Sequence, residues 1–144
     1  MLLGQCQTLA VLHSFAGGTD GQYPYASLVR DSAGNFYGTT GSGGRYKNGS
    51  VFKLSPKSGR WTTSLIYSFK GAPDGSGPAG SLVFDTKGNL YGTTVGGGTS
   101  AGVCGTYGGC GTVFKLAPAA GGKWTEVVLH RFKGDLTEYS HMLV

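Results

Sequence analysis

The sequence has few charged residues and no long apolar run. Asp, Glu, Lys and Arg together make up 13% of the 144 residues. No segment approaches the roughly 20 consecutive apolar residues of a membrane-spanning helix. No window of about ten residues carries the apolar stripe of an amphipathic helix either. We therefore expect no membrane span and essentially no helix.

The basic residues also lack the clustering that nucleic-acid-binding proteins show. The net charge is +5, from 12 basic and 7 acidic residues, and the basic residues are scattered singly. A basic balance can attract an acidic partner, but a nucleic-acid footprint needs a patch or a stripe of Lys and Arg. We expect a solvated surface and no nucleic-acid partner.

Cysteine is scarce, and its placement is informative. Of the three cysteines, Cys104 and Cys110 bracket a Gly-rich stretch, whereas Cys6 lies far from both. The spacing of the pair can close a small disulfide ring, which implies an oxidising compartment. A zinc site needs about four ligands, and no neighbouring Cys or His supplies the others. We predict a disulfide between Cys104 and Cys110, no metal and no other cofactor.

Glycine, in contrast, is abundant, and it punctuates an internal repeat. The stretch Gly-Asn-Phe-Tyr-Gly-Thr-Thr at residues 34–40 returns as Gly-Asn-Leu-Tyr-Gly-Thr-Thr at residues 88–94. An Asp-Gly-x-x-Pro loop precedes both copies, and a Gly-rich loop and a Val-Phe-Lys-Leu segment follow them. An apolar run ending in Phe closes each unit and is also found at residues 11–15. Self-similarity at a period of about 50 residues is typical of repeat architectures.

Each unit predicts four short strands joined by hairpin-like turns, and its apolar runs suit a sheet covered on both faces. The fold class is therefore all-β and β-propeller-like, with two four-stranded antiparallel blades; a β-sandwich or an open solenoid is the alternative. Two blades do not close a ring of 4 to 8, so we expect a fragment or a chain that associates through open blade edges. The predicted divisions are 1–8, an N-terminal segment; 9–15, the outer strand of a preceding blade; 16–69, blade one; 70–132, blade two; and 133–144, a truncated or divergent tail.

The order of these segments resembles the GloVer tandem repeat of bacterial surface or secreted proteins that carry varied C-terminal anchors. The resemblance covers roughly residues 9–134. It implies export and tandem, propeller-like repeats, and it implies no established activity. We expect neither an export signal nor an anchor domain within these residues. An extracellular or cell-surface location is thus expected from the resemblance and from the cysteine pair.

Binding residues are expected in the loops, because loops on a rigid scaffold commonly carry binding. The tyrosines could stack on a sugar ring, and the aspartates could accept bonds from its hydroxyl groups. The alternative is that both aspartates only cap their own turns. The predicted ligand-binding residues are Asp20, Tyr23, Tyr46, Lys47, Asp74 and Tyr107.

Other repeated side chains have structural interpretations. Tyr37 and Tyr91 are expected to pack within strands. His13 and His130 share their position with Tyr67, and this interchange favours packing over a role as a general base. We assign no catalytic residue.

Three functions remain open. The favoured one is a non-catalytic extracellular repeat module that presents loops to carbohydrate or to another surface protein. The second is a propeller enzyme, a glycosidase or lyase, although glycoside hydrolysis needs two carboxyl groups at a defined separation. The third is a structural spacer or assembly repeat.

Overall fold

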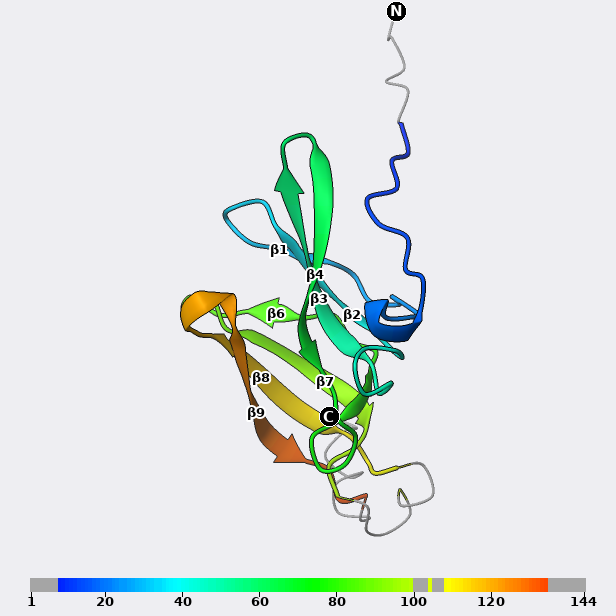
Figure 1. The fold of residues 1–144 in the computed structure, drawn as a ribbon. Helices are drawn as coiled ribbons and strands as arrows, with labels where there is room; N and C mark the ends of the chain where they lie inside the picture. The colour runs from blue at the N-terminus through cyan, green and yellow to red at the C-terminus, as the bar shows by residue number, and fades with distance from the viewer. Residues whose placement is uncertain (1–7, 100–103, 105–107, 135–144) are drawn as a thin grey trace, which may run out of the picture.

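A computed structural model describes residues 8–99, 104 and 108–134, and two antiparallel sheets make up its fold (Figure 1). The first sheet has the order β1 (Val29–Arg30), β2 (Phe36–Thr40), β3 (Ser50–Lys57) and β4 (Arg60–Ser68). In the second, β5 (Ser76–Pro78) and β6 (Val83–Phe84) both pair with β7 (Leu90–Gly96), followed by β8 (Thr112–Pro118) and β9 (Trp124–Arg131). The helical elements in the described ranges are two short 3-10 turns, η1 (Gly18–Asp20) and η3 (Ala120–Gly122). The all-β prediction is confirmed, and no helix in this part of the chain could cross a membrane.

The repeated heptapeptide forms the end of a hairpin turn and the strand that follows it. Gly34 takes a φ of +85°, the left-handed conformation that glycine supplies in such a turn. The carboxylate of Asp31 accepts hydrogen bonds from the backbone N–H and side-chain amide of Asn35, at 2.9 and 2.7 Å. It also accepts one from the hydroxyl of Tyr37, at 3.0 Å. The same three bonds recur around Asp85 in the second repeat.

The central glycine of the heptapeptide is required by an aromatic ring that lies across it. A Cβ placed on Gly38 would be 2.6 Å from the Phe52 ring, and one on Gly92 would be 2.6 Å from the Phe114 ring. Real Cβ atoms do not approach other atoms so closely. The neighbouring strand therefore covers the backbone at this point in both repeats.

The two sheets pack face to face around an apolar core. Tyr37 of β2 lies edge-on to Phe84 of β6 at 5.2 Å between ring centroids. Phe69, just after β4, lies edge-on to Phe114 of β8 at 5.0 Å. Burial of this apolar surface is the main force that holds the sheets together. The fully buried cluster consists of Tyr37, Val51, Phe69, Leu82, Leu90, Phe114 and Leu116.

Two local features differ from the prediction. Residues 8–15 form no strand, although the run at 11–15 resembles β4 and β9. Those two strands pair with β3 and β8 of their own repeats, and the described residues hold no third strand of that kind. Phe15 nevertheless packs on Phe52 at 4.9 Å, as Phe69 does on Phe114.

The second difference is β5, which lies in a segment predicted to be only a loop. It pairs with the end of β7 in an antiparallel arrangement. At the matching place in the first repeat the pairing is a single bridge between Gln22 and Ser42. The second sheet therefore has five strands where four were predicted.

Candidate functional site

The Asp-Gly-x-x-Pro loop and the Gly-rich loop of the first repeat lie together. The backbone N–H of Gly44 donates to the carbonyl of Gly18 at 2.9 Å. The Gly-rich loop also contacts the second repeat, because the N–H of Gly77 donates to the carbonyl of Asn48 at 2.9 Å. Backbone hydrogen bonds therefore join the Gly-rich loop to the preceding loop of the first repeat and to the second repeat.

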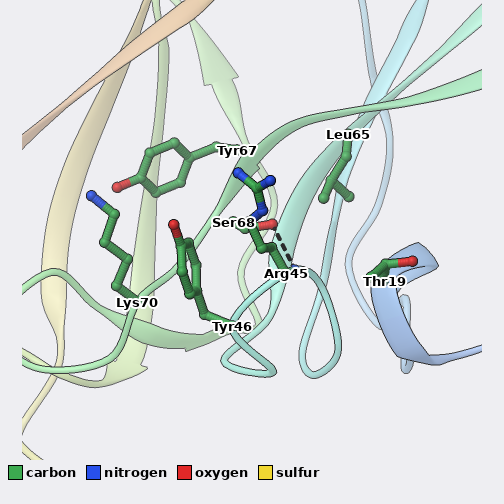
Figure 2. Close-up of a pocket in the computed structure, with 7 residues that line it drawn as sticks. All are labelled: Thr19, Arg45, Tyr46, Leu65, Tyr67, Ser68 and Lys70. Atoms are coloured by element: carbon green, nitrogen blue, oxygen red, sulfur yellow. Dashed lines mark hydrogen bonds between the residues drawn. The ribbon is translucent and has the colours of Figure 1, made fainter.

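Beside these loops is a cavity of about 520 Å³, a size typical of small-ligand sites. Arg45 and Tyr46 come from the Gly-rich loop, and Lys70 follows β4. In Figure 2, Tyr46, Tyr67 and Lys70 lie on one side of Arg45, and Leu65 and Thr19 lie on the other. The lining residues are Thr19, Arg45, Tyr46, Leu65, Tyr67, Ser68 and Lys70.

Hydrogen bonds hold the wall of this cavity in place. The hydroxyl of Tyr67 donates to Asp74 at 2.6 Å, and the backbone N–H of Lys70 donates to the same carboxylate at 2.8 Å. Burial raises the pKa of Tyr67 well above its usual range, and the hydrogen bond and negative charge of Asp74 raise it further. The N–H of Arg45 donates to the Ser68 hydroxyl at 3.1 Å, which fastens the loop to β4.

The electrostatics of the cavity favour an anion. The side chains of Arg45 and Lys70 are exposed at its rim. None of the described residues that line it has a carboxyl group. The Asp74 carboxylate, bonded to Tyr67 and to the backbone of Lys70, offsets part of this charge, and the two cations at the rim can attract an anionic ligand.

Of the predicted ligand-binding residues that the structure describes, only Tyr46 lines this cavity. Tyr23 lies in a different depression with His13, Phe15 and Pro24. Its ring stacks on Tyr25 at 5.7 Å.

Two further predicted residues have other positions. Lys47 is exposed, with a φ of +64°, and it does not line the cavity. Tyr107 falls outside the described residues.

The two predicted aspartates both bind their own loops. Asp20 accepts a 2.8 Å bond from the N–H of Ala16 and lies 3.1 Å from Nε2 of His13. Asp74 makes the equivalent contacts with Lys70 and Tyr67. This geometry agrees with the alternative in which the aspartates cap turns. Their contact with a ligand stays a prediction.

The sequence held a signal for Tyr67 that the packing interpretation overlooked. His13 and Tyr67 each precede an aspartate by seven residues, and each donor contacts that aspartate. His and Tyr occupy the same position of the repeat, and each forms a hydrogen bond with the aspartate seven residues later. A polar role at this position explains why the two residue types interchange. Arg45 and Lys70 had no such signal, because each is a single exposed cation.

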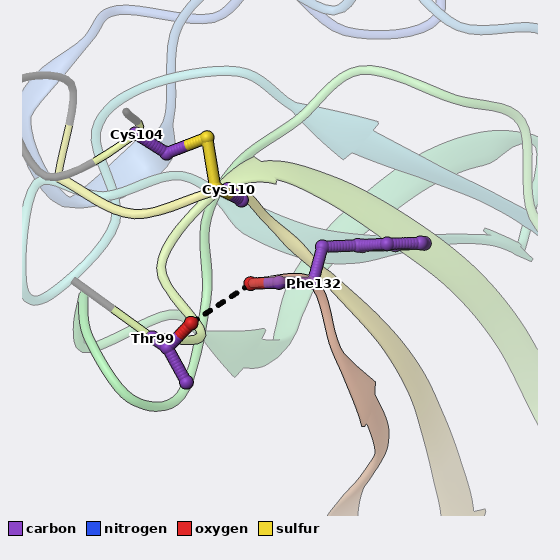
Figure 3. The surroundings of a disulfide bond; sticks show 4 residues. All are labelled: Thr99, Cys104, Cys110 and Phe132. Atoms are coloured by element: carbon purple, nitrogen blue, oxygen red, sulfur yellow. Dashed lines mark hydrogen bonds between the residues drawn. A yellow bond between two sulfur atoms is a disulfide. The ribbon is translucent and has the colours of Figure 1, made fainter. Parts of the chain in front are cut away.

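The predicted disulfide is present in the second repeat. Cys104 and Cys110 are bonded, with their Cα atoms 5.0 Å apart, in the loop between β7 and β8. The hydroxyl of Thr99, which precedes the cysteines in that loop, donates to the carbonyl of Phe132 at 3.0 Å (Figure 3). The described residues contain no group of three or more Cys, His, Asp and Glu side chains that could hold a metal ion.

One ionisable residue that the sequence did not single out lies near Asp74. Burial raises the pKa of Glu126, on β9, to about 7, and the negative charge of Asp74 adds to the shift. The positive charges of Arg131 and Lys70 oppose it. Its Oε1 is buried, and no described group forms a hydrogen bond with it. Glu126 does not line the cavity.

Comparison with known proteins gives one match. The model of a protein family described as the Gloeobacter/Verrucomicrobia repeat matches residues 3–143. No curated protein and no solved structure matches the chain. The match spans both sheets and agrees with the resemblance found in the sequence.

Proposed function

The chain belongs to the Gloeobacter/Verrucomicrobia repeat family, and we propose that it is a non-catalytic repeat module. We propose that it binds acidic carbohydrate in the cavity beside the Gly-rich loop. The observation that carries this proposal is the lining of the cavity. Two tyrosines, Tyr46 of the Gly-rich loop and Tyr67 of β4, line the cavity together with two cationic side chains, Arg45 and Lys70.

These side chains suit a sugar that bears a carboxylate. An aromatic ring offers an apolar face for the C–H surface of a sugar, and a tyrosine hydroxyl adds a polar contact. The guanidinium of Arg45 can pair with a carboxylate through two parallel hydrogen bonds, and Lys70 can add a point charge. A uronic-acid oligosaccharide combines both kinds of group.

The lining argues against hydrolysis. Glycoside hydrolysis needs two carboxyl groups that flank the scissile bond. The described lining residues provide none, and Asp74 is already bound to Tyr67 and Lys70. Binding without catalysis is therefore the function that the site supports best.

The proposal includes an extracellular location and a blade-like arrangement of the repeats. A disulfide between Cys104 and Cys110 is compatible with an oxidising compartment. Sheets whose strands follow one another in the order β1-β2-β3-β4 and pack face to face are what neighbouring propeller blades require. Both points support the proposal without depending on the cavity.

The test is binding of a defined oligosaccharide to the oxidised chain. Calorimetry would compare an oligogalacturonate with a neutral cello-oligosaccharide of equal length, after a glycan array. We expect the oligogalacturonate to bind and the neutral sugar to bind more weakly. Arg45→Ala should reduce the affinity about tenfold or more, since a hydrogen bond to a charged group contributes about 1.5–3 kcal/mol. Added salt should weaken binding.

Two tyrosine variants distinguish binding in the cavity from non-specific binding to exposed tyrosines. Tyr46→Ala should lose affinity, whereas Tyr25→Ala, which removes an exposed tyrosine outside the cavity, should not. Absence of binding to any arrayed glycan contradicts the proposal. Binding that is unchanged in both Arg45→Ala and Tyr46→Ala would contradict it as well.

A further inference from the structure

The dipeptide Leu-Val occurs at the same place in both repeats, but its two side chains exchange environments. In the second repeat, Leu82 is 1% exposed in the inter-sheet core and Val83 is 63% exposed. In the first repeat, Val29 packs against the core and Leu28 is 43% exposed. Each sheet therefore turns a different one of its two faces toward the other sheet.

The face of the first sheet that points away from the second sheet is here called the N face and consists of Leu28, Phe52, Leu54 and Leu65. Phe52 and Leu54 are already buried within the chain, whereas Leu28 and Leu65 are exposed. Gly38, Phe52 and Leu65 are paired across the sheet, and Leu28 lies against Gly38. The counterparts of three of these side chains are Leu82, Phe114 and Leu116, which are buried against the other sheet. The N face thus repeats a surface that is buried elsewhere in the same chain.

The uncovered face of the second sheet is here called the C face and consists of Val83, Tyr91, Lys115, Val127 and Leu129. Val83, Tyr91, Lys115 and Val127 pair in one row across the sheet. The matching row of the first sheet is Val29, Tyr37, Lys53 and Ser64, and this row faces the second sheet. The C face thus repeats the other half of the internal interface.

We propose that the N face of one copy of this chain docks onto the C face of a second copy, head to tail. The contact reproduces the packing between the two sheets within one chain. Phe15 already occupies part of the N face, on Phe52, at 4.9 Å, in the way that Phe69 packs on Phe114. The partner surface therefore has to cover mainly Leu28 and Leu65, which remain exposed.

Charge and aromatic contacts at the rim agree with this docking. Asp31 and Lys123 line one pocket between the two sheets. Their counterparts across the proposed contact are Asp85 and Arg60, which again have opposite charges. Arg30 occupies the position in the first repeat that Phe84 occupies in the second. Within one chain the Phe84 ring packs on Tyr37, and across the proposed contact the guanidinium of Arg30 would take the place of that ring. A guanidinium over the Tyr91 ring would be a favourable cation–π contact.

The two faces of such a contact differ, so the association is heterologous. A heterologous contact leaves one N face and one C face free after the first step. Further copies then add until a ring closes, or they form an open stack. We do not expect an isologous dimer, because it would require the N face or the C face to pack against a second copy of itself.

The test is the molar mass of the full 144-residue chain in solution, measured by light scattering and sedimentation over a range of concentrations. We expect species heavier than one chain. Leu28→Arg on the N face and Val83→Arg on the C face should each weaken association by about tenfold or more, because an arginine would be buried without a partner. Leu65→Arg is a second N-face variant, for use if Leu28→Arg does not fold.

The control is Tyr25→Arg, which introduces the same charge on another exposed apolar side chain. The counterpart of Tyr25 is Ala79, which stays exposed although the second sheet is covered on that side. Position 25 is therefore outside the proposed contact, and association should not change.

Mixing the two variants tests whether the N face of one copy contacts the C face of another. Leu28→Arg chains retain an intact C face, and Val83→Arg chains retain an intact N face, so an equimolar mixture should form heterodimers that neither variant forms alone. Only folded chains can rescue each other, which separates loss of contact from unfolding. A wild-type chain that stays monomeric at all concentrations would overturn the proposal. Variants that associate normally, or a mixture without rescue, would also overturn it.

Discussion

The hydroxyl of Tyr37 donates a 3.0 Å hydrogen bond to Asp31, while its ring packs edge-on against Phe84 of the other sheet. One side chain therefore joins a hairpin turn of the first repeat to the core between the repeats. Tyr91 makes the same bond to Asp85, but it lies on the uncovered side of the second sheet. The two tyrosines form a matched pair in different environments.

This pair gives the first prediction. Tyr37→Phe removes a hydrogen bond from a buried tyrosine to a carboxylate and should lower the free energy of unfolding by about 1–3 kcal/mol. Tyr91→Phe should have a smaller effect, because the Tyr91 side chain is more exposed than that of Tyr37. Urea unfolding of both variants measures the difference. Equal losses would contradict the assignment of Tyr37 to the interface.

Tyr37→Phe should also change the pKa of Asp31. Burial raises the pKa of Asp31, but hydrogen bonds from Asn35 and Tyr37 outweigh it and hold the pKa below the ordinary value. Tyr37→Phe removes one of these bonds, so the pKa of Asp31 should rise. A carboxyl titration followed by NMR would detect the shift.

The sequence predicted the repeat, the hairpins and the absence of long helices, because these follow from local patterns. Gly34 and Gly88 occupy the hairpin turns and have positive φ in both copies. The central glycine, Gly38, was not explained by the sequence alone. Its reason is a ring from the next strand, and that contact depends on the register between strands.

The site was predicted less completely than the fold. The Gly-rich loop and Tyr46 were identified, because loops on a rigid scaffold commonly carry binding. Arg45 and Lys70 were not, since a single exposed cation has no pattern and their proximity depends on two loops meeting. Residues 9–15 were predicted as a strand from their likeness to the apolar run that closes each repeat, but they form no strand in the structure.

A second prediction concerns the close approach at Gly38. A methyl group there would lie 2.6 Å from Phe52 and 2.7 Å from Leu28, so Gly38→Ala should lower the free energy of unfolding by about 1–3 kcal/mol. Gly41→Ala is the control, because its nearest neighbour is at 3.6 Å and its φ is not positive. It should be nearly neutral or slightly stabilising. Thermal unfolding of the two variants compares them, and similar midpoints would contradict the packing argument.

A third prediction concerns the disulfide. It closes a loop with a sequence separation of 6, so its loss should cost about 2 kcal/mol in the chain-entropy description. The double variant Cys104→Ala, Cys110→Ala should show this loss and should no longer respond to a reductant. Denatured, unreduced wild type should have one free thiol per chain, from Cys6. A count of three would show that the bond does not form.

The fourth prediction is a pH dependence of stability from Glu126. Its pKa is raised from the ordinary value of 4.5 to about 7 by burial and by the charge of Asp74. Between these values the folded chain holds a proton that the unfolded chain has lost. The free energy of unfolding should therefore fall as the pH rises from about 4.5 to about 7, and this contribution should be constant above that window.

Glu126→Gln tests the assignment, because glutamine keeps the shape and cannot ionise. The variant should lose the slope between pH 4.5 and 7 and should be more stable than the wild type at pH 8. Asp85 provides the contrast. Hydrogen bonds, chiefly from the Asn89 side chain, lower its pKa to about 2, so Asp85→Asn should alter the pH dependence only below about 3.8. Urea unfolding at a series of pH values measures both, and an unchanged slope in Glu126→Gln would assign the effect to another group.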